Sequence, residues 1–340
     1  MSTFNRIRAV RWIMLLLLLL VILSCLSCTS HESRHDAEDE EYVLFVPRSD
    51  SLWSQNAIHG FLDTCKEYDI AGTVLNFQMD ENLMMLNLSQ VIHQGVDGIV
   101  LMSPEPTSGW SIMSSALSSN TPIISMDEKI TDSQGRQLVP YIGIDNYAAG
   151  EKAGIWAVRS IIRERWVINE NISYRIAIFT YNDFNGMKDR TDSFVKVIHQ
   201  EIPEISEDAY ISVDCDNGSA VDGLLAMQGL LTENPGISHW FVFGATANSV
   251  IGAVRALEQV DLAETSIACW IDAGIGFKEF SEEKGPACQA LVYVDTYKQG
   301  SKAVELLYGY HHKHSIIPPA SYLQIDLITK DTRCQGEDSQ

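Results

Sequence analysis

The chain has 340 residues, 46% of them hydrophobic, and a formal net charge of −21. The roughly 300 residues after the N-terminal segment exceed one usual hydrophobic core, so they predict two lobes. The excess of 45 acidic over 24 basic residues argues against nucleic acid and against an anionic membrane surface as partners, because both carry negative charge.

The N-terminal segment has the order of a secretory signal. Three arginines within the first 11 residues precede the apolar run Trp12–Leu23, which contains six consecutive leucines. The run is shorter than the roughly 20 residues that span a bilayer, and small residues follow it. We expect residues 1–24 to be removed, which leaves 21 basic and 45 acidic residues and a net charge of −24. An uncleaved anchor helix is the alternative, and it also places the remainder outside the cytoplasm.

Two cysteines, Cys25 and Cys28, follow the apolar run. The Ser24-Cys25 junction resembles the lipobox of bacterial lipoproteins, in which the cysteine becomes the lipidated first residue. Ile22 stands where an aliphatic residue is usual, so Cys25 is the predicted lipidation site, while the bulk of Leu23 leaves Cys28 open. Residues 25–41 are too polar to bury a core and predict a flexible, lipid-anchored tether.

The other cysteines show neither a CxxC motif nor metal-ligand spacing. We expect buried or unpaired thiols, although a Cys269–Cys288 disulfide in an oxidising compartment stays open. These five cysteines are Cys65, Cys215, Cys269, Cys288 and Cys334.

A histidine-rich segment lies near the C-terminus. His311, His312 and His314 surround Lys313, and we interpret them as a polar helix end rather than a metal site. The sequence predicts no metal and no cofactor.

From residue 42 onward, short apolar runs alternate with amphipathic stretches. The apolar runs predict buried parallel strands at 42–46, 73–77, 98–102, 122–126, 175–180, 210–213, 240–243, 266–271 and 290–294. The stretches between them predict helices at 54–68, 81–94, 148–163, 187–199, 221–231, 249–259 and 298–310. This alternation predicts an α/β fold of doubly wound parallel sheets, whose ligands bind beyond the carboxyl ends of the strands.

The strand ends carry a family resemblance. YVLFVPRSDSLW, TPIISMDEKI, VPYIGIDNYAAGEKAG, ACWIDAG and VYVDTYKQGSKAVELLY, among other segments, resemble type I periplasmic sugar-binding proteins in the same order. The resemblance runs from about residue 42 to 330 and is greatest to the arabinose- and ribose-binding members. Proteins of this family bind substrates for ABC importers.

The resemblance implies two lobes joined by three crossover segments. The N-terminal lobe would comprise residues 42–144 and 295–322, and the C-terminal lobe residues 145–294 and 323–330, with a tail at 331–340. The ligand, most simply a monosaccharide, would bind between the lobes. We expect a monomer whose partners are the sugar, an ABC permease or a membrane sensor, and the membrane through its lipid.

The resemblance also implies ligand-binding residues. Trp53 matches a stacking aromatic, Asp127 and Asp272 match ligand aspartates, and Glu128 occupies a position that is acidic in arabinose-binding members. Carboxylates suit sugar hydroxyls because charge strengthens the hydrogen bond. The alternative interpretation is that Trp53 caps its own lobe and that the carboxylates tie down loops.

Several positions depart from the family pattern. Lys188 aligns with the family's ligand arginine, and Arg190 follows two positions later. Thr246 and Ala247 replace an Asn-Asp pair, and a lysine and a glutamate are replaced by Pro47 and Ser51, with Arg48 adjacent. Asp145 and Asn146 fall at the first crossing, where they either satisfy backbone groups or contact ligand. These departures put arabinose itself in doubt.

The predicted function is that of an extracytoplasmic solute-binding lipoprotein serving an ABC importer. The sequence has no Walker A, GxSxG or HExxH motif and no nucleophile with a positioned base, so we expect no enzyme. One alternative is a binding protein that presents its ligand to a sensor kinase or chemoreceptor. A second alternative is an exported enzyme with an acidic cleft.

Overall fold

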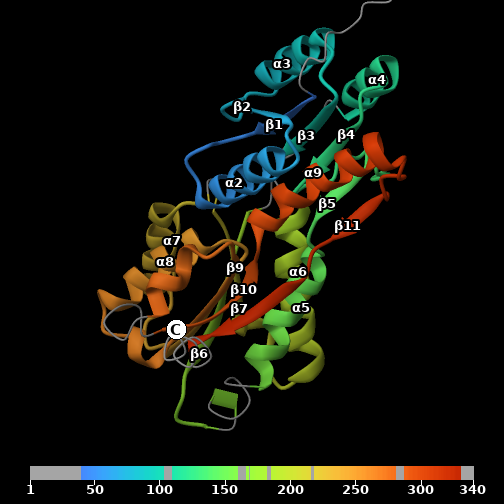
Figure 1. Cartoon of the computed structure of the whole chain (residues 1–340). Helices are drawn as coiled ribbons and strands as arrows, with labels where there is room; N and C mark the ends of the chain where they lie inside the picture. The colour runs from blue at the N-terminus through green and yellow to red at the C-terminus, as the bar shows by residue number, and fades with distance from the viewer. Residues whose placement is uncertain are drawn as a thin grey trace, which may run out of the picture. The chain divides into compact units, whose positions relative to one another are not determined.

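The computed structural model describes residues 40–102, 109–159, 166–167, 169–181, 185–215, 218–280 and 287–330 (Figure 1). The predicted signal, both lipobox cysteines, nearly all of the tether and the C-terminal tail lie outside the described residues. No described helix combines the length and the apolar character needed to cross a membrane.

The first sheet contains six strands in the order β11-β5-β4-β3-β1-β2, all paired in parallel. Because β1 lies between β2 and β3, the strand order reverses direction there, as in other doubly wound sheets that bind ligands at this point. The strands are β1 (Glu41–Val46), β2 (Ala71–Asn76), β3 (Gly98–Met102), β4 (Ile123–Met126), β5 (Tyr141–Gly143) and β11 (Ala320–Tyr322).

The second sheet repeats this plan in the order β12-β10-β9-β8-β6-β7. Its last strand, β12, runs antiparallel to β10, so the expected parallel arrangement holds for the other five strands. The strands are β6 (Tyr174–Thr180), β7 (Tyr210–Asp214), β8 (His239–Gly244), β9 (Ile267–Asp272), β10 (Cys288–Val294) and β12 (Ile325–Thr329).

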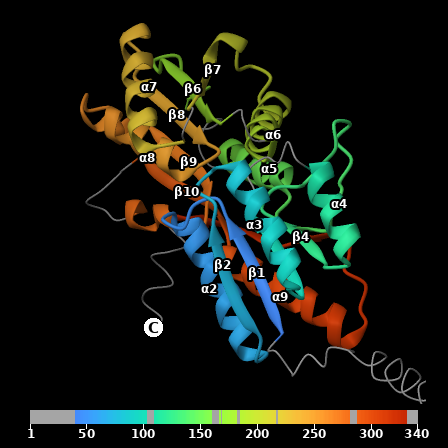
Figure 2. The same cartoon turned by 90° about the horizontal axis from the view of Figure 1, so that it is seen from above.

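Helices cover the sheets, and three pairs of them pack side by side: α2 with α9, α5 with α6, and α7 with α8 (Figure 1, Figure 2). Apolar side chains from helices and strands meet in buried clusters around each sheet. The helices are α2 (Leu52–Glu67), α3 (Glu81–Gln94), α4 (Gly109–Ser119), α5 (Asn146–Ala157), α6 (Asn185–Glu201), α7 (Ala220–Glu233), α8 (Ala247–Glu258) and α9 (Thr296–Lys313).

The chain passes between the two sheets three times: after β5, after β10 and after β11. The predicted class, two doubly wound α/β lobes joined by crossovers, is therefore confirmed. Elements absent from the prediction include α4 and the short strands β5, β11 and β12, which offer little sequence on which a periodicity could be recognised.

The described cysteines, Cys65, Cys215, Cys269 and Cys288, are buried, and no disulfide joins any two of them. Cys269 and Cys288 lie on the neighbouring strands β9 and β10 but pair with alanines rather than with each other, so the disulfide left open by the sequence does not form. Cys334 lies outside the described residues.

Candidate functional site

Trp53 lies where apolar clusters of the two sheets meet. The Ser51 hydroxyl accepts a hydrogen bond from the Ser54 amide at 3.1 Å and caps α2. Trp53 is thus in the first turn of this helix rather than in the expected loop. Its ring packs against one buried cluster from each sheet, and its buried indole N–H has no hydrogen-bond partner among the described residues. An aromatic face is therefore fixed between elements of both sheets.

Asp127 follows β4 directly and has a left-handed backbone, with φ of 75°. Its amide donates to the Ile142 carbonyl at 3.0 Å, and the Tyr141 hydroxyl donates to its carbonyl at 3.1 Å. These bonds to β5 hold the turn in place. Aspartate is suited to the position because it adopts the left-handed region more readily than most residues. The carboxylate faces Trp53, whose indole favours its charged form, although the contact falls short of a hydrogen bond.

Arg190 supplies a buried positive charge from α6. Its side chain is 2% exposed, and its Nε and Nη1 donate to the Asn146 Oδ1 and the Ala245 carbonyl, both at 2.8 Å. Its Cζ lies 5.6 Å from the centroid of the Trp53 ring. Among the described residues, Arg190 has no carboxylate within ion-pair distance. The guanidinium therefore keeps donors that these two bonds do not use, and its burial makes a further acceptor at this place favourable.

Asp272 is the last residue of β9 and is 6% exposed. Its Oδ1 accepts a hydrogen bond from the Ile275 amide at 2.6 Å, which ties down the following loop. The Gly274 and Ala273 amides also favour the charged form of Asp272, and its two oxygens still offer more acceptor sites than this loop fills. Asp272 therefore serves the loop and keeps acceptor capacity for another partner.

Burial raises the proton affinity of all three carboxyl groups, and repulsion from Asp127 adds to that of Glu128. Burial raises the pKa of Asp127, and burial together with the Asp127 charge raises the pKa of Glu128 to about 8. Burial raises the pKa of Asp272 to about 6. The positive charge of Arg190 opposes each of these shifts, so the four side chains form one electrostatic unit, which we term the carboxylate cluster.

Glu128 also reaches the start of α6. A Cβ at Gly186 would overlap the Glu128 carboxylate and the Asn146 amide, and the Gly186 backbone N–H favours the charged Glu128. Only glycine allows this approach. A cavity of about 140 Å³ adjoins Glu128, with Asp189 and Tyr322 also in its wall.

Two predicted residues lie apart from the carboxylate cluster. Lys188 is exposed and forms an ion pair with Asp192 one turn along α6, so the guanidinium of Arg190, not the lysine, faces Trp53. Thr246 is the N-terminal capping residue of α8, and its hydroxyl lies 3.1 Å from that of Ser249.

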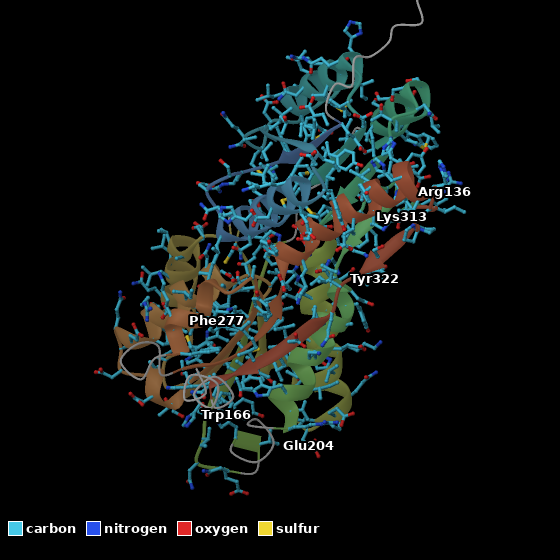
Figure 3. All side chains as sticks on the ribbon, in the orientation of Figure 1. Arg136, Trp166, Glu204, Phe277, Lys313 and Tyr322 are labelled. Atoms are coloured by element: carbon cyan, nitrogen blue, oxygen red, sulfur yellow. The ribbon has the colours of Figure 1, made fainter. Side chains whose placement is uncertain are left out.

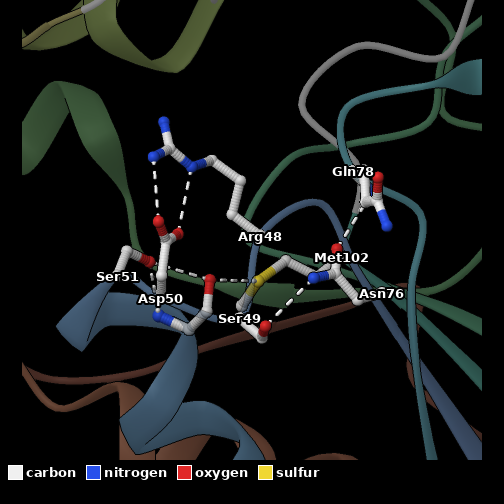
Figure 4. Close-up of polar contacts among 8 residues, drawn as sticks. Arg48, Ser49, Asp50, Ser51, Asn76, Gln78 and Met102 are labelled. Carbon is white, nitrogen blue, oxygen red and sulfur yellow. Dashed lines mark hydrogen bonds and ion pairs between the residues drawn. The ribbon is translucent and has the colours of Figure 1, made fainter.

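Arg48 and Asp50, which follow β1, form a two-bond exposed ion pair with both distances 3.1 Å (Figure 4). Arg48 is therefore engaged locally, and Ser51 is used to cap α2.

One residue that contributes to the site, Asn56, had no signal in the sequence. Asn56, in α2, donates to the Ala273 carbonyl at 3.5 Å and so joins elements of the two sheets.

Asp145 and Asn146, for which the sequence left two roles open, both make local contacts. Asn146 accepts a hydrogen bond from Arg190 and positions it, and Asp145 caps α5 through the Ala148 amide at 3.0 Å. The described residues contain no group of three or more His, Cys, Asp or Glu side chains arranged to hold a metal, including the histidines at the end of α9.

Comparison with known proteins places this arrangement in a family. Residues 42–313 match the periplasmic binding protein domain. The chain belongs to the periplasmic binding protein family.

The individual relatives of this chain are distant in sequence. The L-arabinose-binding periplasmic protein of Escherichia coli (strain K12) is 22% identical over 269 residues, 77% of this chain and 80% of that protein. An ABC transporter L-arabinose-binding periplasmic protein of Azospirillum brasilense is 27% identical over 220 residues, 63% of this chain and 64% of the relative. A periplasmic solute-binding protein of Actinobacillus succinogenes 130z, solved with D-allose, has a TM-score of 0.72 at 19% identity and covers 87% of this chain and 99% of its own.

Proposed function

We propose that the protein is an extracytoplasmic binding lipoprotein that captures a neutral monosaccharide and delivers it to an ABC importer. The observation that carries the proposal is the carboxylate cluster, in which Asp127 and Asp272 act on Arg190, whose guanidinium lies over the Trp53 ring. Membership of the periplasmic binding protein family and the two arabinose-binding relatives support it.

The chemistry of the cluster suits a neutral polyhydroxylated ring. Carboxylates accept hydrogen bonds from hydroxyl groups, the guanidinium donates to hydroxyl or ring oxygens, and the Trp53 face covers apolar C–H groups. Three buried carboxyl groups beside one guanidinium disfavour an acidic sugar, because its carboxylate would add a buried negative charge next to them.

The proposed ligand contacts are Trp53, Asp127, Arg190 and Asp272. Glu128, the fourth member of the cluster, is proposed to shape the site. Lys188 and Thr246 are left out because they lie apart from the cluster, Lys188 being exposed and paired with Asp192. The lobes proposed to close on the ligand are residues 42–144 with 295–322 and residues 145–294 with 323–330.

A thermal-shift screen tests the sugar-binding function. Arabinose, ribose, galactose and allose form the neutral set, and glucuronate is the charged control. A neutral sugar at 100 times its Kd should raise the free energy of unfolding by about 2.7 kcal/mol. A chain that responds to glucuronate but to no neutral sugar, or to no sugar at all, would contradict the proposal.

The proposed lipid anchor has its own test. Mass spectrometry of the protein extracted from host membranes should find acyl chains on Cys25, because the Ser24-Cys25 junction has the better lipobox context. Lipid on Cys28 would move the site, and a soluble chain with an unmodified N-terminus would remove the anchor from the proposal.

A further inference from the structure

An apolar groove of about 720 Å³ lies beside the first sheet, away from the carboxylate cluster. It is formed by the end of α4, by the residues that lead into β4 and β5, and by the connection from α9 to β11. The groove therefore lies at the amino-terminal ends of β4 and β5, whereas Asp127 follows the carboxyl end of β4. The groove and Asp127 therefore lie at opposite ends of the same strand, β4.

Large apolar side chains are exposed along this groove. Ile316 is 91% exposed, Leu117 is 75% exposed and Tyr310 is 37% exposed. Single exposed apolar residues are ordinary, but several around one concave surface mark a place where another molecule binds.

The groove differs in charge from the rest of the chain. The described residues that line it include no aspartate or glutamate, although the chain has 45 of them. At its rim, α9 ends in His311, His312 and Lys313, with His314 as its cap (Figure 3 labels Lys313). Cations are favoured there by the helix dipole. Repulsion between this acidic protein and a lipid surface is therefore weakest at the groove.

The described chain begins next to the groove. The Glu41 amide donates to the Asp97 carboxylate at 2.9 Å, and the Asp97 carbonyl lies 2.8 Å from Nε2 of His311, a groove residue. The proposed lipidated cysteine precedes this point by a polar segment that ends at Glu40. A segment of about 15 residues spans roughly 20 Å as a random coil, so the proposed anchor would keep the groove close to the lipid surface.

We propose that this groove docks on the membrane surface and inserts Leu117 and Ile316 into the lipid interface. The inference rests on the lipid anchor in the proposed function.

Cysteine labelling on the full mature lipoprotein tests the docking. Leu117→Cys and Ile316→Cys report on the groove, and Leu225→Cys is the matched control, because it is an exposed apolar residue on α7 in the second-sheet part. The described native cysteines are buried, and the unsubstituted protein gives the background. In phosphatidylcholine vesicles, a membrane-impermeant maleimide should label the two groove positions at least tenfold more slowly than in detergent, with the control unchanged.

Equal labelling of groove and control positions in vesicles that carry the protein would overturn the docking and leave the anchor standing. Protection in detergent that grows with protein concentration would assign the groove to a second copy and also overturn it. A protein that does not float with vesicles would contradict the anchor, and the docking with it. Sugar binding, measured by thermal shift on the same variants, should be unchanged. A protein that binds no sugar would contradict the proposed function and leave the docking result standing.

Discussion

Arg190 holds a charge where few of its possible hydrogen bonds are made. Asn146 and the Ala245 carbonyl fix the guanidinium, and the Trp53 ring covers one side, while Asp127, Glu128 and Asp272 act on it through space. This arrangement keeps donor and acceptor groups near one another without joining them directly. A sugar that bridges them would satisfy both sets.

Asp127→Asn and Asp272→Asn should each weaken sugar binding. Loss of one charge-assisted hydrogen bond costs about 1.5–3 kcal/mol, or roughly 10- to 150-fold in Kd. Calorimetric titration with a sugar from the screen measures this.

Asp132→Asn is the matched control, because Asp132 is a buried loop carboxylate that accepts from the amides of Gln134 and Arg136 at 2.8 and 2.9 Å. It should lower the melting temperature and leave Kd unchanged. The same pattern in Asp127→Asn and Asp272→Asn would show that they only tie down loops.

Glu128 should make the ligand-free protein less stable as pH rises. Its pKa of about 8 exceeds its ordinary value of 4.5, so between these values the folded chain binds more protons than the unfolded chain. The free energy of unfolding must then fall with rising pH in this window, by at most about 1.4 kcal/mol per pH unit from this group.

Denaturant titrations at pH 5 to 8 should show a smaller decline for Glu128→Gln than for the unsubstituted protein, because the amide cannot ionise. Glu67→Gln, at an exposed position of α2, should follow the unsubstituted protein. A Glu128→Gln variant with the full decline would place the titrating group elsewhere.

The helix pairs are held together at glycines. A Cβ on Gly60 would overlap the Tyr297 carbonyl between α2 and α9, and a Cβ on Gly150 would overlap the Arg190 carbonyl between α5 and α6. The second of these contacts sets the position of α6 against α5 and hence that of the guanidinium. Close backbone packing thus connects helix arrangement to the carboxylate cluster.

Two glycines of α7 allow the effect of close helix packing on stability to be distinguished from the effect of helix propensity. A Cβ on Gly223 would overlap the Ser249 carbonyl of α8, whereas a Cβ on Gly229 would meet nothing within 4 Å. Gly223→Ala should lower the free energy of unfolding by about 1–3 kcal/mol through overpacking. Gly229→Ala should raise it by up to about 1 kcal/mol, because alanine favours the helix. Equal effects in urea titrations would show that α7 and α8 are less closely packed.

At the scale of the whole molecule, three crossings join two sheets of the same plan. Among the described residues, side chains that link elements of the two sheets include Trp53 with Arg190, Asn56 with Ala273, and Glu128 with Gly186. Each of these links is a contact at the surface between two separately packed cores, which is compatible with closure on a ligand as two bodies.

Small-angle scattering tests closure. A saturating sugar should reduce the radius of gyration, and Gly186→Ala should bind more weakly and close less, since its Cβ would displace Glu128. Gly229→Ala provides the control for a helix glycine without neighbours. An unchanged radius at saturation in the unsubstituted protein would exclude the hinge model.

The sequence by itself determined the order of strands and helices, because each element has a local hydrophobic pattern. The continuous apolar run 98–102 predicts a buried strand, and the amphipathic stretch 81–94 predicts a helix. It also located the strand ends that carry Asp127 and Asp272. Only the tertiary structure decided which cation of α6 faces Trp53. Successive helix residues are about 100° apart, so Lys188 and Arg190 point to different sides, and only packing against α5 sets which side turns inward.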